Sequence, residues 1–118
     1  MPIATKRAYD PPSAGDGYRV LVDGLWPRGI TKENLKVAEW MRPIAPTTQL
    51  RKWYGHKPER WEEFRKRYRH ELADPAREAL LVQLVERARK EKVTLVFAAH
   101  DAERCNASAL AEIIREQM

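Results

Sequence analysis

The sequence predicts a single α/β domain, built on a mainly parallel sheet of about four strands that is layered by helices. Its 118 residues suit one domain, and 43% hydrophobic with 33% charged residues are typical of a folded chain. Short β-branched runs alternate with segments of helical periodicity, which favours the α/β class. Residues 93–99 (VTLVFAA) are almost continuously apolar, as in a strand that is covered on both faces.

The first half of the chain carries the weaker signals. Residues 3–9 and 19–23 are predicted strands, separated by the turn-forming stretch 10–17. Residues 24–29 form a loop, and Thr31 caps one predicted helical turn that ends at residue 36. Residues 37–44 are predicted to be a weak third strand that ends at Pro43.

The second half carries clearer helix signals, because capping residues precede apolar stripes there. The predicted helices are one capped by Thr47 or Thr48 and ended by Gly55, one starting at Pro58, one capped by Asp74 with Pro75 at its first position, and one capped by Asn106. The helix after Asp74 leads into strand 93–99 and gives the clearest helix–strand unit.

Residues 51–70 hold the whole charge surplus of the chain. They contain eight basic and three acidic side chains, and this difference equals the net charge of +5. Such a segment can attract nucleic acid, or it can be a solvated helix face with internal ion pairs. The nucleic-acid hypothesis uses Arg51, Lys52, Arg65, Lys66 and Arg69, with the neighbouring aromatics available for stacking.

Three polar loops follow predicted strands, beginning at Tyr9, Asp23 and His100. In open parallel sheets, ligands bind beyond the carboxyl ends of the strands. These loops are therefore expected to meet at one edge and to bind a small polar or anionic ligand. Whether catalysis follows binding is left open.

The loop at Asp23 offers a carboxylate and an arginine. Asp23 ends an apolar strand, where a carboxylate needs a partner, and Arg28 or Arg7 could provide it. The arginine could instead hold a ligand carboxylate or phosphate in a two-pronged contact. Trp26 either contacts the ligand or packs the loop down.

The loop at His100 offers an acid–base group and a thiol. His100 could transfer a proton near neutral pH, together with Asp23 as the second candidate catalytic residue. Asp101 and Asn106 are candidate ligand-binding residues or, alternatively, caps. Cys105 is either a thiol with a lowered pKa at a helix start or a buried packing residue.

Trp53 and His56 complete the candidate site. Trp53 could stack on a planar ring, although aromatics at helical spacing more often belong to the core. His56 follows a helix-ending glycine and is expected in a loop. The histidines lack metal-ligand spacing, and no phosphate-loop, dinucleotide or nucleophile-elbow motif is present, so no metal or cofactor is expected.

Four blocks together resemble the bacterial domain of unknown function 488 family, in its YeaO-like branch. The blocks are KRAYD (6–10), VDGLWPRG (22–29), LRKWYGH (50–56) and VFAAHD (96–101). The resemblance covers nearly the whole chain and implies a compact α/β domain without an established activity. It implies motif positions at Arg7, Asp23, Trp26, Pro27, Arg28, Gly29, Trp53, His56, Asp101 and Asn106.

The sequence departs from this family at two cations. Gly24 stands where the family usually has arginine, and His100 where it often has lysine, so a site that relied on both would be altered. Longer relatives carry Cys-His-Arg near the position of Cys105, where this chain reads Cys-Asn-Ala. A single cysteine and the lack of a leader-like or membrane-spanning apolar run favour the cytoplasm.

Overall fold

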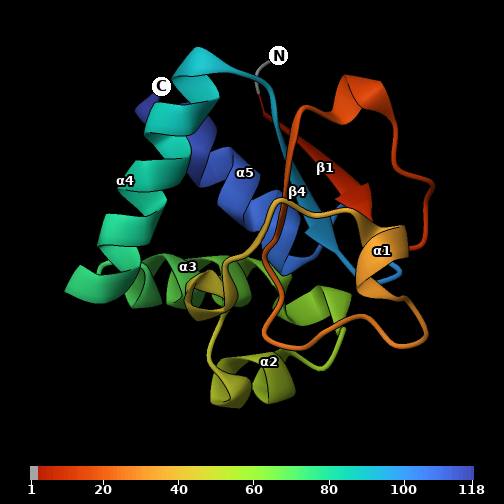
Figure 1. The fold of residues 1–118 in the computed structure, drawn as a ribbon. Helices are drawn as coiled ribbons and strands as arrows, with labels where there is room; N and C mark the ends of the chain where they lie inside the picture. Colours follow the sequence, from red (N-terminus) through yellow and green to blue (C-terminus); the bar gives the residue numbers. More distant parts are fainter. Residues whose placement is uncertain (1–2) are drawn as a thin grey trace.

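The structure, a computed structural model, describes residues 3–118 and confirms the α/β class (Figure 1). The strands are β1 (Ile3–Arg7), β2 (Tyr18–Leu21), β3 (Glu39–Trp40) and β4 (Val93–Phe97). The α-helices are α1 (Lys32–Leu35), α2 (Thr48–Tyr54), α3 (Trp61–Glu71), α4 (Pro75–Lys90) and α5 (Asn106–Gln117). Three 3₁₀ turns lie at Ala14–Asp16, Arg42–Ile44 and Pro58–Arg60.

The strand order is β1-β4-β2-β3, and all three pairings are parallel. β4 therefore lies between β1 and β2 although it is the last strand in the sequence. All five of its residues are buried, which confirms the expectation of a strand covered on both faces.

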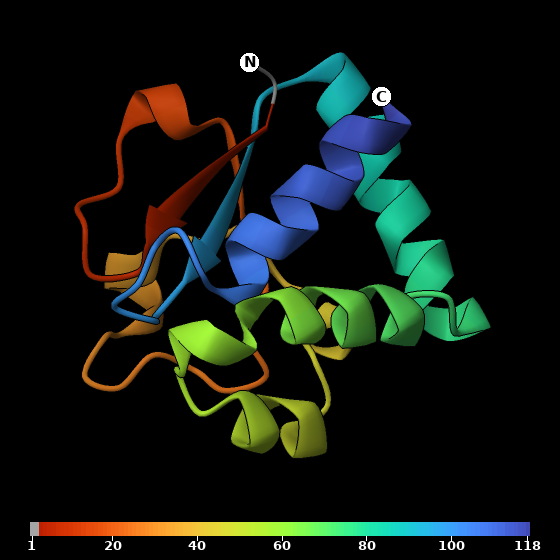
Figure 2. The same ribbon diagram turned by 180° about the vertical axis from the view of Figure 1, so that it is seen from behind.

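The two faces of the sheet carry different layers. One face packs on the large core formed with α3, α4 and α5, and α5 contacts β1 and β4 and lies beside them in the view from behind (Figure 2). The other face is covered by α1 and its flanking loops, through Leu35, Trp26 and Trp40. Along β4, Val93, Leu95 and Phe97 face the first layer, as the period of two residues requires.

Local capping signals place most helices where the sequence predicts them. Thr47 accepts a hydrogen bond from the Leu50 N–H, and Gly55 ends α2 in the left-handed region at φ 54°. Asp74 caps α4 in the same way through the Arg77 N–H. The donor and the acceptor of each cap lie three residues apart, so these caps can be predicted from the local sequence.

The prediction of a third strand over residues 37–44 is correct only for its centre. β3 is two residues long, and the chain then turns into the 3₁₀ segment that contains Pro43. Proline has no N–H for a sheet ladder and fixes its own φ, so it ends the strand early.

A buried ion cluster lies on the α1 side of the sheet. The Asp16 carboxylate contacts Arg19 Nη1 at 2.7 Å and Lys6 Nζ at 3.1 Å, and accepts two hydrogen bonds from Ser13. Burial alone would raise the pKa of Asp16, but the hydrogen bonds from Ser13, Lys6 and Arg19 outweigh it and hold this pKa well below its usual range. The Thr94 hydroxyl donates to the Asp16 carbonyl at 2.6 Å, which ties the cluster to β4.

Candidate functional site at the carboxyl edge of the sheet

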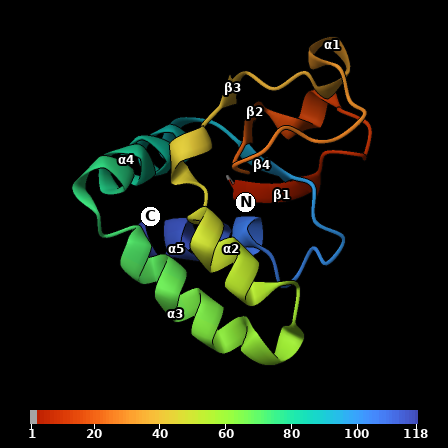
Figure 3. The ribbon, with the colours of Figure 1, turned by 90° about the horizontal axis from the view of Figure 1, so that it is seen from below.

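The loops after β1, β2 and β4 begin at the same edge of the sheet, as the sequence predicts. The Ala8 N–H donates to the Phe97 carbonyl at 2.6 Å, and the Val22 N–H donates to the Val96 carbonyl at 3.1 Å. Figure 3 looks toward this edge from below, with α2 in front of α5 and beside the sheet. The parallel pairing of three adjacent strands thus brings the candidate residues of these three loops to one edge.

Asp23 joins three elements at this edge. Its Oδ2 accepts from the Ala98 N–H at 2.9 Å, and its Oδ1 accepts from Asn106 Nδ2 at 3.1 Å. The same Asn106 amide donates to the Val22 carbonyl at 3.1 Å. The carboxylate therefore links the end of β2, the end of β4 and the start of α5.

The expected ion pair of Asp23 with Arg28 or Arg7 does not form among residues 3–118. Uncharged amide donors satisfy the carboxylate, so no arginine is needed beside it. Burial raises the pKa of Asp23, while Asn106, the Ala98 N–H and the charge of Arg51 act in the opposite direction and only partly offset it.

A chain of contacts runs from Arg28 to His100 across the edge. The Tyr9 hydroxyl donates to the Arg28 carbonyl at 3.0 Å, and the Arg7 guanidinium carbon lies 5.4 Å from the centroid of the Tyr9 ring. Arg7 Nε donates to the Ala99 carbonyl at 3.0 Å, one residue before His100. The side chains of Arg28 and His100 are both exposed.

Asp101 shapes the loop that follows β4. Its Oδ1 accepts from the N–H groups of Glu103 and Arg104, both at 3.0 Å. The Arg104 N–H contributes most to a lowered pKa of Asp101; burial acts in the opposite direction but is outweighed by this N–H together with the Glu103 N–H and the Arg104 side chain. Asp101 therefore forms an Asx turn inside the loop and does not cap a helix.

The prediction that Asn106 caps α5 is wrong, and the structure separates the two interpretations of Cys105. Cys105 is the residue that precedes the helix, and Asn106 is its first residue, because the Asn106 side chain is used on Val22 and Asp23 instead. The Cys105 thiol is buried, and this burial raises its pKa above the ordinary value. A thiol in this state is poorly nucleophilic at neutral pH, so the packing interpretation of Cys105 fits the structure.

His56 lies at the end of α2 in a conformation that is unusual for its residue type. Its φ is 56°, directly after Gly55 at 54°, so two successive residues are left-handed. Its ring centroid lies 6.4 Å from that of Tyr54, whose hydroxyl donates to the Arg104 carbonyl at 2.9 Å. α2 is thereby joined to the loop after β4, with His56 beside this junction.

Each of the two candidate tryptophans, Trp26 and Trp53, has its ring in contact with other side chains of the protein. Trp26 donates to the Ile30 carbonyl at 2.7 Å and packs edge-to-face on Trp40. Trp53 lines a separate cavity of about 530 Å³ between α2 and α3, with the guanidinium of Arg67 4.0 Å from its centroid and that of Arg60 at 5.2 Å. Trp53 is therefore not part of the group at the edge of the sheet, and cations cover its ring.

The basic segment 51–70 is partly neutralised by residues that are distant in sequence. Arg65 pairs with Glu62 and with Glu112 of α5, and Arg69 pairs with Glu116 of α5 at 2.7 Å. Arg67 pairs with Glu63, as the spacing of four residues predicts. Arg51, Lys52 and Lys66 are exposed and enter no ion pair within residues 3–118.

Sequence reasoning placed Tyr9 at the start of one loop but did not identify it as a site residue, and it did not place Tyr54 or Arg51 in this region. Tyr9 has a usable signal, because a large aromatic stands beside Arg7 where a strand ends, and it is 47% exposed. Tyr54 and Arg51 have no such signal, since the α2 helix reaches the edge only through the tertiary fold.

Within residues 3–118, no cluster of three or more histidine, cysteine, aspartate or glutamate side chains could hold a metal ion. None of the helices that the structure describes is both long and apolar enough to cross a membrane.

Comparisons with known proteins give one consistent family. Residues 2–118 match the family model described as the inactive DUF488-N3 subclade. The chain is 41% identical over 115 residues to the uncharacterized protein YeaO of Escherichia coli K12, covering 98% of each chain. It is also 41% identical over 112 residues to an uncharacterized protein of Mycobacterium tuberculosis H37Rv, covering 95% of this chain and 92% of that protein. No solved structure matches the chain.

Proposed function

Since the chain belongs to the inactive DUF488-N3 subclade, we propose that it binds a small anionic ligand at the carboxyl edge of its sheet without transforming it. The observation that carries this proposal is the set of cations around that edge. Arg7, Arg28 and Arg51 enter no ion pair within residues 3–118, whereas Arg19, Arg65 and five other cationic side chains do.

The cations at the edge are held in place by contacts that leave their charge unneutralised. Arg7 is fixed by the Ala99 carbonyl and by the Tyr9 ring, neither of which carries a negative charge. The Tyr9 hydroxyl in turn holds the backbone of Arg28. A guanidinium whose position is fixed loses less conformational entropy when it binds a carboxylate or phosphate.

Two features support binding without catalysis. Both oxygens of Asp23 accept hydrogen bonds from the protein itself, and the thiol of Cys105 is buried. The family description of an inactive subclade agrees with this. Asp23 and Asn106 then act as positioning residues that join the three loops.

Phosphate titration followed by amide NMR shifts tests the proposal. We expect inorganic phosphate, at constant ionic strength, to shift residues 8–10, 24–29 and 99–101. The double variant R7Q/R28Q is expected to bind phosphate at least about tenfold more weakly, since two charge-assisted hydrogen bonds are lost.

Arg77 supplies a matched control variant. Its Nε donates to the Pro43 carbonyl at 3.1 Å, as Arg7 Nε does to Ala99, but it lies on α4 away from the edge. R77Q is expected to bind phosphate as the unmodified protein does. Equal phosphate affinity in R7Q/R28Q and the unmodified protein would refute the proposal.

Nucleic acid is a second candidate partner, favoured by the exposed and unpaired side chains of Arg51, Lys52 and Lys66. The ion pairs of Arg65 and Arg69 with α5 leave fewer cations than the sequence predicts for this role. We place either function in the bacterial cytoplasm, which the single, buried cysteine supports.

A further inference from the structure

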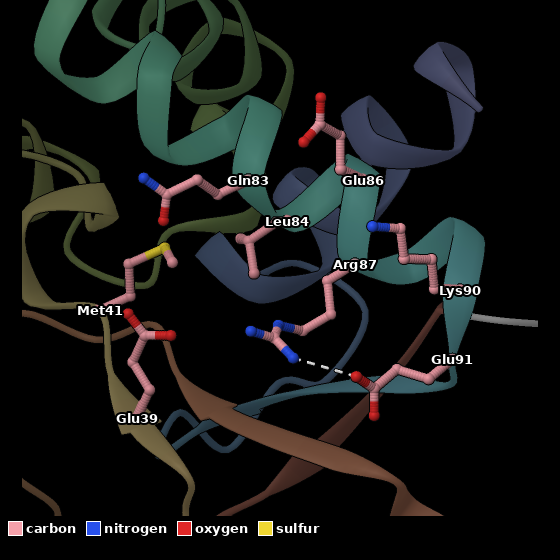
Figure 4. Close-up of a pocket in the computed structure, with 8 residues that line it drawn as sticks. All are labelled: Glu39, Met41, Gln83, Leu84, Glu86, Arg87, Lys90 and Glu91. Carbon is pink, nitrogen blue, oxygen red and sulfur yellow. Dashed lines mark hydrogen bonds and ion pairs between the residues drawn. The ribbon is translucent and has the colours of Figure 1, made fainter.

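A cavity of about 280 Å³ lies between the edge strand β3 and helix α4, away from the carboxyl edge of the sheet (Figure 4). It is lined by charged side chains of both signs and by two apolar side chains. Drug-sized ligands occupy cavities of roughly 300–1,000 Å³, so this cavity suits a smaller molecule.

One wall carries an oriented carboxylate. Glu39 of β3 points into the cavity, and its Oε1 accepts a hydrogen bond from the Tyr18 hydroxyl at 2.6 Å. The second oxygen, Oε2, has no hydrogen-bond partner within residues 3–118. A carboxylate fixed through one oxygen can offer the other to an ammonium group.

The opposite wall carries an oriented guanidinium. Arg87 of α4 lies over the Tyr18 ring, with 3.8 Å between the guanidinium carbon and the ring centroid, and its Nη1 pairs with Glu91 at 3.0 Å. Nε and Nη2 donate no hydrogen bond within residues 3–118. Figure 4 shows Arg87 and Glu39 facing one another across the cavity.

The rest of the lining consists of two apolar side chains, one amide and three further charged side chains, Glu86, Lys90 and Glu91. Met41 and Leu84 are buried and close the space between the charged walls, and Gln83 stands above it. A ligand that matches Glu39, Arg87 and the two apolar side chains between them has one positive charge, one negative charge and a short aliphatic part. We propose that this cavity binds a free α-amino acid with an aliphatic side chain.

The contacts of the proposed ligand follow from the two walls. Its ammonium donates to Glu39 Oε2, and its carboxylate accepts from the free nitrogens of Arg87. Its side chain lies against Met41 and Leu84. Tyr18 orients both charged walls, through its hydroxyl and through its ring, so the site is arranged before the ligand arrives.

Three ligands that differ by one charged group test the proposal on the unmodified protein. L-leucine, 3-methylbutylamine (leucine without its carboxylate) and 4-methylpentanoate (leucine without its ammonium) are titrated while NMR shifts of Met41 and Leu84 are followed. Leucine is expected to bind, and each analogue to bind at least about tenfold more weakly, as one charge-assisted contact is missing.

Single-residue variants assign the contacts. E39Q and R87Q are each expected to weaken leucine binding about tenfold or more, whereas E78Q, on the exposed part of the same helix, is expected to leave it unchanged. Equal binding of the amine and leucine would overturn the proposal, as would an absence of shifts at Met41 and Leu84. Because the analogues are compared on the unmodified chain, loss of folding in a variant cannot account for the result.

Discussion

Replacing Asp16 by asparagine removes the one negative charge from the buried cluster on the α1 side of the sheet. The Arg19 side chain, only 5% exposed, then keeps its charge without a carboxylate. It retains the hydrogen bond from Nη2 to the Leu35 carbonyl at 2.8 Å, but its Nε already lacks a partner within residues 3–118. Lys6, at 22% side-chain exposure, can turn to water.

The expected loss of stability follows from leaving this guanidinium unpaired. Breaking a buried ion pair by removing one partner costs about 3 kcal/mol or more. For a chain of this size, that corresponds to a fall in Tm of roughly 10 °C. Urea unfolding of the unmodified protein and D16N measures the difference, with an unchanged m-value as the sign that both unfold from the same compact state.

The difference between the two proteins should also depend on pH. The pKa of Asp16 is lowered by folding, so its contribution to stability is fully present above the unfolded-state pKa of about 3.9 and is lost as pH falls below it. The two unfolding free energies are therefore expected to differ by a constant amount from pH 5 to pH 8 and to converge in more acidic solution.

An exposed ion pair supplies the control. Glu63 and Arg67 are each about half exposed, and E63Q is expected to change the unfolding free energy by less than about 0.5 kcal/mol. A loss below about 1 kcal/mol in D16N at neutral pH would show that the cluster is not an essential buried pair.

Three further outcomes are expected. In Gly17→Ala, the new Cβ would lie 2.4 Å from the Lys92 carbonyl oxygen, and the backbone at position 17 has φ 66°. Thermal unfolding should show that the unfolding free energy falls by at least about 2 kcal/mol. An unchanged unfolding free energy would contradict the close approach. Tyr68→Phe leaves the Ile44 carbonyl without its 2.7 Å donor, and urea unfolding should show a loss of about 1–2 kcal/mol. If residues 51–70 bind nucleic acid, the five cations of this segment that enter no ion pair within residues 3–118 predict a log–log salt slope of about −4.5 in gel-shift titrations. A much steeper slope would contradict the ion pairs with α5.

The parts of the fold that the sequence predicts are those decided within one turn of chain. The caps at Thr47 and Asp74 and the glycine at the end of α2 are satisfied by their immediate neighbours. The burial of β4 is likewise predicted by its own five residues. Such features depend little on the tertiary structure.

The parts that escaped prediction depend on partners far along the chain. Asn106 resembles a helix cap in sequence, but its side-chain amide donates a hydrogen bond to the carbonyl of Val22, 84 positions away. Asp23 resembles one member of an ion pair, yet its donors come from residues 98 and 106. The convergence of the three loops was predictable because parallel strands share an edge, whereas the donors that each side chain selects there were not.

The central place of β4 has a consequence for how the protein is made. Its partners β1 and β2 do not pair with each other, and each is hydrogen-bonded to β4. While the ribosome is still translating α4, both early strands therefore lack the neighbour that completes their backbone hydrogen bonding. Sheet assembly must wait until nearly the whole polypeptide has emerged, and a nascent chain stopped before Val93 would expose these segments to aggregation or to chaperones.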